Sequence, residues 1–197
     1  MLEKTKAKIG AGWAALKRLG VLMAIWGVIF SFATISRLAV AFDYDDTLVF
    51  STPAYEKAYA ETAQPFTAQF WTVVNQSYDL EKPKLAGCAA AYLFRIFGFQ
   101  VSIIASRPEA GSEGLRKEWR RLVPKSRFLF AGDRGSKSRF FENGNFLLFF
   151  GDGDSDISDA RKAKVYPVRV LRSPKSTFKD DYSPGTQGEF VLPLSQY

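Results

Sequence analysis

Two clusters of aspartates are the residues of this 197-residue chain best suited to chemistry. The first is Asp43-Tyr44-Asp45-Asp46-Thr47, which directly follows an uninterrupted apolar run at residues 38–42. The second is Gly151-Asp152-Gly153-Asp154-Ser155-Asp156, which follows the apolar run at 146–150. Either cluster alone would also suit an acidic turn or a helix N-cap. Together, each placed after a strand-like run, they favour a shared site.

The position of both clusters at strand ends predicts a metal site. In doubly wound sheets, ligands bind beyond the carboxyl ends of the parallel strands. Carboxylates that meet there repel one another unless a divalent cation lies between them. Mg²⁺ prefers oxygen ligands of this kind. We therefore expect the two clusters to hold Mg²⁺ at one edge of a sheet.

Apolar runs of strand length alternate with helical patterns, which predicts an α/β fold with a parallel sheet. Strands are expected at residues 38–42, 101–105, 128–131, 146–150 and 168–171, and helices at 85–97, 109–122, 137–142 and 155–163. The connection 48–84 is long, rich in aromatic residues and contains three prolines, which predicts a small cap. Residues 172–197 are expected to form an irregular tail with a strand near 190–192.

Residues 1–37 have the layout of an export signal or a membrane anchor, ahead of a catalytic domain at 38–197. Basic residues precede the uncharged run 21–35, so the N-terminus is expected in the cytoplasm and the rest beyond the membrane. As a helix the run spans about 22 Å, against a hydrocarbon core of about 30 Å, which suits a signal peptide better. Ser31-Phe32-Ala33 has small residues at the two positions that signal peptidase recognises before its cleavage site. We expect a periplasmic or extracytoplasmic protein, soluble after cleavage or anchored by residues 21–35.

Charge and composition exclude several other classes. The formal net charge is +7, but residues 1–37 hold six cations and one acid, so the remainder carries only +2. This distribution argues against nucleic acid as the main partner. The chain has no histidine, which excludes Ser-His-Asp and Cys-His catalysis and ordinary zinc sites. The single cysteine, Cys88, lies in a helical pattern and does not have the spacing to an arginine that a cysteine-based phosphatase needs.

Three longer stretches resemble one known family. They are AFDYDDTLVFSTP, LFAGD followed by Lys137-Ser138, and FFGDGDSDISDAR with VRVLRSPKSTFK. They are similar to the bacterial class B nonspecific acid phosphatases of the haloacid dehalogenase (HAD) superfamily, whose first and last motifs read DxDxT and GDxxxD. The resemblance covers residues 38–55 and 128–197 well and is thinner between them.

The resemblance implies a Rossmann-like doubly wound parallel sheet, the HAD fold, with a cap after the first strand. It implies an Mg²⁺-dependent acid phosphatase that hydrolyses small phosphomonoesters, including nucleotides, through an aspartyl-phosphate intermediate. Phosphotransfer to another alcohol is a close variant. It also implies a homo-oligomer, since the family forms tetramers. Membrane association is expected if the N-terminal segment stays uncleaved.

By this resemblance, particular residues receive roles. Asp43 would be the nucleophile, Asp45 the acid and base, and Lys137 the cation that neutralises the phosphoryl oxygens. The implied protein ligands of Mg²⁺ are Asp43, the main-chain carbonyl of Asp45, and Asp152, with Asp156 in support.

The substrate-binding residues depart in part from the family pattern. In Ile104-Ala105-Ser106-Arg107-Pro108, Ala105 stands where the family has a hydroxyl residue. Ser106 or main-chain N–H groups would then bind the phosphate, with Arg107 as a clamp. The side chains expected to form a slot for an aromatic leaving group such as a nucleoside are Phe50, Phe70, Trp71 and Phe178.

Two alternatives remain from the sequence. Ala105 favours a catalytically weakened or non-catalytic binding protein with the same fold, and a buried first helix would make this a cytoplasmic phosphatase. Retention of Asp43, Asp45, Lys137 and Asp152 favours an enzyme, a phosphoric monoester hydrolase.

Overall fold

The computed structural model describes residues 2–142 and 144–197. The chain divides into two compact units, with the boundary between Arg37 and Leu38. The first unit is helix α1 (Leu2–Ile35). Its segment Leu16–Ile35 has a mean hydropathy of 1.8, and by length and composition it is suited to crossing a membrane. A signal sequence has the same properties.

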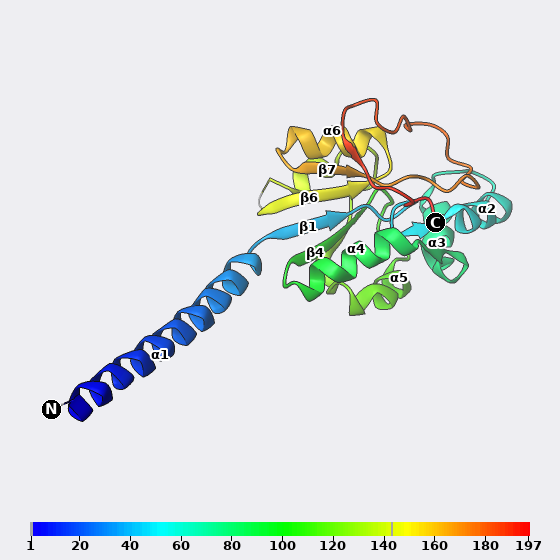
Figure 1. Ribbon diagram of the computed structural model, residues 1–197. Helices are drawn as coiled ribbons and strands as arrows, with labels where there is room; N and C mark the ends of the chain where they lie inside the picture. The colour runs from blue at the N-terminus through cyan, green and yellow to red at the C-terminus, as the bar shows by residue number, and fades with distance from the viewer. Residues whose placement is uncertain (1, 143) are drawn as a thin grey trace. The chain divides into compact units, whose positions relative to one another are not determined.

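The second unit contains a six-stranded parallel sheet in the order β5-β4-β1-β6-β7-β8 (Figure 1). Its strands are β1 (Ala39–Phe42), β4 (Gln100–Ala105), β5 (Phe128–Phe130), β6 (Phe146–Gly151), β7 (Tyr166–Arg169) and β8 (Phe190–Val191). The predicted α/β fold with a parallel sheet is confirmed. After β1 the chain builds β4 and β5 on one side, then places β6 and β7 on the other, so a switch point lies beside β1.

The alternation of side chains along β1 divides the core between the two faces of the sheet. Val40 and Phe42 belong to one buried cluster, whereas Ala41 belongs to the other. Helices α4 (Leu85–Ile96) and α5 (Glu113–Glu118) lie on the first face, and α6 (Asp154–Lys162) lies on the second (Figure 1). Both faces of β1 are therefore buried, which explains its uninterrupted apolar sequence.

Residues 48–84 form a small helical insertion. They contain β2 (Val49–Phe50), α2 (Thr52–Glu61), α3 (Ala68–Gln76), the 3₁₀ turn η1 (Tyr78–Leu80) and β3 (Lys82–Pro83), with β2 and β3 antiparallel. The two helices share a buried cluster of their own, formed by Tyr55, Ala58, Phe70 and Val74. The insertion follows β1, where the sequence predicts a cap.

Two predicted helices are shorter than expected. The pattern at 109–122 yields α5 and then a 3₁₀ turn, η2 (Trp119–Arg121), because Gly111 adopts a positive φ of 70° and delays the helix start. The pattern at 137–142 yields only the 3₁₀ turn η4 (Lys137–Phe140). A further 3₁₀ turn, η3 (Lys125–Arg127), precedes β5. The tail is irregular apart from β8, which pairs with β7.

Helix α4 supports the loop after β1 through a close backbone approach. A Cβ atom on Gly87 would lie 2.2 Å from the main-chain oxygen of Thr47. Only glycine therefore allows α4 to pack this closely against the first aspartate cluster. Within this loop, Asp46 adopts a positive φ of 51°, in the left-handed region.

Candidate active site

A small pocket lies where β1 and β6 end, as expected at the switch point of a doubly wound sheet. Its volume is about 50 Å³. The residues that line it come from both aspartate clusters, from α2, from the segments after β4 and β5, and from the tail; they are Asp43, Asp45, Asp46, Tyr55, Ser106, Arg134, Asp152, Gly153, Ser155, Asp156, Arg172, Phe178 and Asp181.

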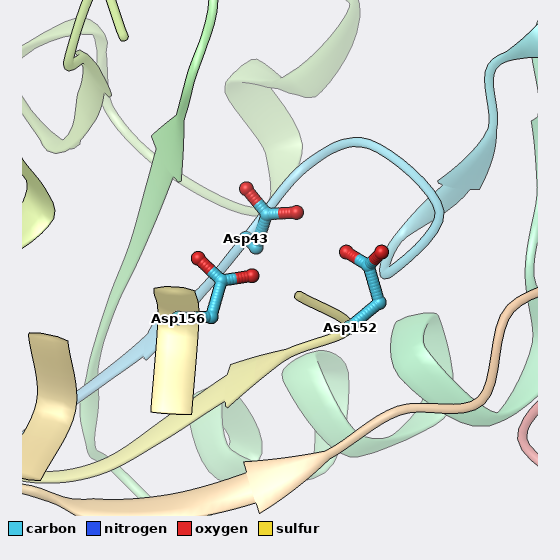
Figure 2. A group of neighbouring side chains, drawn as sticks. All are labelled: Asp43, Asp152 and Asp156. Carbon is cyan, nitrogen blue, oxygen red and sulfur yellow. The ribbon is translucent and has the colours of Figure 1, made fainter. Parts of the chain in front are cut away.

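Three buried aspartates converge at the base of this pocket. Asp43 follows β1, Asp152 follows β6, and Asp156 lies in the first turn of α6. One oxygen from each lies within 4.8 Å of the others, and Figure 2 shows the three carboxylates facing a common space. A Cβ atom on Gly151 would lie 2.6 Å from the Asp156 side chain, so glycine is required there for Asp156 to reach the group. The predicted meeting of the two clusters is what the structure shows.

Lys137 provides the cation that balances this group. Its buried ammonium forms ion pairs with Asp43 and with Asp156, the latter at 2.7 Å. The main-chain N–H of Lys137 donates to Asp159 at 2.8 Å, which fixes the start of η4. Burial raises the pKa of the Asp43 carboxyl well above its usual range, although Lys137 opposes that rise. The two carboxylates outweigh burial for Lys137 and raise the pKa of its ammonium.

The Asp45 side chain is held by Arg107 and Tyr55. Arg107 donates to it from Nε at 3.0 Å and from Nη2 at 2.6 Å, and Tyr55 donates from its hydroxyl at 3.4 Å. Burial raises the pKa of Asp45, but the Arg107 charge and its hydrogen bonds outweigh burial and lower it overall. Asp45 also lines the pocket that the three aspartates share.

The second motif occupies the end of β4 and the loop after it. Ala105 is buried at the end of β4, and Ser106 lines the pocket. Arg107 is fully buried, and its guanidinium binds Asp45 and Glu81. Among the described residues, Arg107 does not line the pocket. In the structure Arg107 contacts protein carboxylates. A direct contact between Arg107 and phosphate stays a prediction.

Arg172 is a site residue that the sequence analysis missed. Its Nε donates to Asp152, and its Nη1 donates to the main-chain oxygen of Asp180 at 2.7 Å. It therefore connects the aspartate group with the irregular tail. Its position in VRVLRSPKSTFK was the available signal, but no periodicity marks a single arginine in such a segment.

A larger cavity of about 890 Å³ shares four lining residues with the small pocket: Tyr55, Ser106, Arg134 and Phe178. Trp71 also lines it, whereas Phe70 is buried in the core of the insertion. The edge of Tyr55 packs against the Phe178 ring with centroids 4.7 Å apart. Phe50 lies in β2 and, among the described residues, lines neither of these cavities.

Lys84 fixes the first aspartate loop against the tail. Its ammonium donates to the main-chain oxygens of Asp46 and Leu171, each at 2.5 Å. Burial lowers the pKa of Lys84 from 10.5 to about 8. At pH values between the folded pKa of about 8 and the unfolded pKa of 10.5, Lys84 carries a proton in the unfolded chain that it has released in the folded protein. The free energy of unfolding therefore rises with pH in this range.

We expect this proton to appear in the pH dependence of unfolding. Relative to Lys84→Met, the wild-type free energy of unfolding should increase by about 2 kcal/mol between about pH 7 and about pH 9.5. Denaturant unfolding of both proteins at the two pH values measures this difference. A difference that stays constant with pH would show that Lys84 keeps its ordinary pKa.

Comparison with solved structures agrees with this fold. A HAD hydrolase of family IA, variant 3, from Entamoeba histolytica superposes with a TM-score of 0.53 at 12% identity, covering 79% of this chain and 92% of that one. A haloacid dehalogenase-like family hydrolase from Xanthomonas campestris gives a TM-score of 0.50 at 15% identity, covering 81% and 91%. The sheet, with aspartates at the ends of its strands, thus has the fold of HAD hydrolases.

Curated relatives narrow this class. The class B acid phosphatase of Edwardsiella ictaluri is 34% identical over 175 residues, which are 81% of this chain and 73% of that protein. That of Citrobacter rodentium is 30% identical over 176 residues with the same coverage. No family model matches the chain. The chain belongs to the class B acid phosphatase family, and it is a phosphoric monoester hydrolase, as predicted.

Proposed function

We propose that this protein hydrolyses small phosphomonoesters through an aspartyl-phosphate on Asp43, with Mg²⁺ as its cation. One observation carries the proposal. Asp43 lines a pocket with two further aspartates and Asp45, and its buried carboxylate forms an ion pair with the buried Lys137. This arrangement supplies a nucleophile, a neutralising cation and a proton donor within one small space.

The residues present fit a divalent cation. Three carboxylates offer hard oxygen ligands, with one oxygen of each within 4.8 Å of the others, and Mg²⁺ selects such ligands. In addition, Oδ1 of Asp46 is buried beside this group and has no hydrogen-bond partner among the residues that the structure describes. Asp43, Asp152, Asp156 and the main-chain oxygen of Asp45 would hold the ion. When bound, Mg²⁺ supplies positive charge that stabilises the phosphoryl oxygens.

The residues of the chain account for both halves of the reaction. A carboxylate oxygen of Asp43 attacks phosphorus and the bond between phosphorus and the leaving oxygen breaks. Asp45, which must carry a proton for this step although Arg107 lowers its pKa, gives that proton to the leaving oxygen. Water then attacks the phosphorus of the aspartyl-phosphate while Asp45 takes a proton from it, which releases phosphate and restores Asp43. The Lys137 ammonium stabilises the negative charge that develops on the phosphoryl oxygens. An alcohol in place of water would make the second half a phosphotransfer.

Removal of the cation should abolish activity. In EDTA we expect turnover of p-nitrophenyl phosphate to fall at least about 10²-fold, because the aspartates then repel the phosphoryl oxygens. Addition of Mg²⁺ should restore it, and Ca²⁺, which binds with longer distances and looser geometry, should restore less. Turnover in EDTA equal to that in Mg²⁺ would contradict the proposed cation.

The larger cavity favours substrates with an aromatic leaving group, such as nucleoside monophosphates. Trp71, Phe178 and Tyr55 present aromatic surfaces to it beside the reaction pocket. A panel that compares nucleoside monophosphates with glycerol phosphate tests this proposal, and Phe178→Ala should raise KM for the nucleotides alone. Equal loss for both substrates would remove the stacking role.

We propose that residues 1–37 export the chain, as signal or anchor, and place the catalytic domain outside the cytoplasm. The exposed apolar segment Leu16–Ile35 supports this. A fusion of residues 1–37 to a reporter that works only after export tests it, and mass spectrometry of the mature N-terminus separates cleavage from anchoring. A homo-oligomer stays a proposal from the resemblance, which sedimentation of the catalytic domain would test.

Ala105 is the observation that favours a weakened or non-catalytic protein. It leaves the end of β4 without a hydroxyl group at the position where the family binds phosphate. Ser106 lines the pocket one residue later and is our proposed replacement. If Ser106 takes that role, Ser106→Ala should raise KM for p-nitrophenyl phosphate, whereas an unchanged KM would leave main-chain N–H groups as the phosphate donors.

A further inference from the structure

Glu81 is a buried carboxylate that the proposed reaction does not use. It follows η1 and precedes β3, and its side chain is 1% exposed. It accepts a hydrogen bond from the Tyr44 hydroxyl and forms an ion pair with Nη2 of Arg107. A buried carboxylate costs free energy unless hydrogen bonds and ion pairs offset the loss of its hydration. The contacts of Glu81 therefore raise the question of its function.

The partner of Glu81, Arg107, holds the Asp45 carboxyl group. The guanidinium is fully buried and forks onto Asp45 through Nε and Nη2, while the same Nη2 reaches Glu81. The rings of Tyr44 and Tyr55 lie 5.0 and 5.2 Å from its central carbon. Asn75 accepts from Nη1 at 3.4 Å and donates to the main-chain oxygens of Pro108 and Ala110, which fixes the loop after Arg107.

These contacts form one chain of interactions that runs from η2 to the active-site pocket. It runs from Trp119, whose Nε1 donates to the Tyr44 hydroxyl at 3.3 Å, through Tyr44, Glu81 and Arg107 to Asp45. Nη2 of Arg107 donates to both carboxylates, and Nε donates to Asp45 as well. A planar guanidinium held by two carboxylates has little freedom to rotate.

We infer that Glu81 is a positioning residue: it fixes the Arg107 guanidinium and, through it, the place of the Asp45 carboxyl group beside the leaving oxygen. The inference rests on the proposed role of Asp45 as proton donor. A displacement of a catalytic group by about 1 Å can lower the rate about 10²-fold, even when the mutation that causes it lies far from the reacting atoms. The effect must therefore appear in the step that needs a proton from Asp45.

The test compares two leaving groups in Glu81→Gln, a change that keeps the size of the side chain and removes its charge. The readout is kcat/KM, which reports the steps up to formation of the aspartyl-phosphate. For glycerol phosphate, whose alcohol must receive a proton, we expect kcat/KM to fall about 10²-fold. For p-nitrophenyl phosphate, whose phenolate leaves as a stable anion, it should fall no more than about threefold.

A merely structural role for Glu81 would lower both values by the same factor, and that result would overturn the inference. Glu118→Gln is the matched control, because Glu118 is exposed near the same region and should leave both values unchanged. Should Glu81→Gln fail to fold, Tyr44→Phe keeps the ring and removes the hydroxyl donor to Glu81. It should shift the ratio of the two substrates in the same direction, and an unchanged ratio would overturn the inference.

Failure of the inference is distinguishable from failure of the proposed function. If the proposed function is wrong, Asp43→Asn retains turnover of both substrates. If only the inference is wrong, Asp43→Asn loses both activities while Glu81→Gln does not discriminate between the leaving groups.

Discussion

Replacement of Asp43 by asparagine should lower turnover of p-nitrophenyl phosphate at least about 10⁴-fold, because an amide cannot form the acyl phosphate. The exchange keeps the volume of the side chain, so the core around it should be undisturbed. Because it also removes one buried negative charge beside two others, we expect the variant to be at least as stable as the wild type in EDTA.

The control for this experiment is Asp79→Asn. Asp79 lies exposed on η1, so the same exchange there should leave turnover unchanged. Turnover by Asp43→Asn within about tenfold of the wild type would rule out Asp43 as the nucleophile.

Lys137→Met has the second largest expected effect, and it acts on both activity and stability. Removal of the ammonium leaves Asp43 and Asp156 buried without their cation. We expect the free energy of unfolding in EDTA to fall by about 3–5 kcal/mol, and kcat in Mg²⁺ to fall about 10²- to 10³-fold. Mg²⁺ should stabilise the variant more than the wild type, because an added cation offsets the lost charge.

Denaturant unfolding with and without Mg²⁺ measures the stability change, and steady-state kinetics measures the rate. Lys117→Met, on the exposed side of α5, is the matched control and should change neither. If Lys137→Met unfolds at the same denaturant concentration as the wild type, the buried ion pairs contribute nothing to the balance of charge at the site.

The sheet and the aspartate group were predictable because their signals are local. An apolar run that ends in an aspartate marks a buried strand and its functional end, and this pattern placed Asp43 and Asp152 on the same edge. The sequence also located the insertion through its prolines and aromatic residues. Helix α5 was predicted to start too early, because the positive φ of Gly111 is set by its neighbours in the fold.

The partners of the buried charges were not predictable from local pattern. Arg107 was expected to face phosphate, yet it contacts Glu81 and Asp45, which lie 26 and 62 positions away along the chain. Arg172 contacts Asp152 from an irregular segment in the same way. Such pairs depend on how distant segments fold together, and neither periodicity nor composition of the sequence reports them.

The central claim is that a phosphoryl group passes through Asp43, and one measurement tests it most directly. Protein that is turning over p-nitrophenyl phosphate in Mg²⁺ is quenched in acid and digested, and its peptides are analysed by mass spectrometry. We predict a phosphoryl group on the Asp43 side chain, absent from protein kept without substrate. Rapid turnover with a phosphoryl group on another residue, or with no phosphorylated peptide at any quench time, would contradict the account.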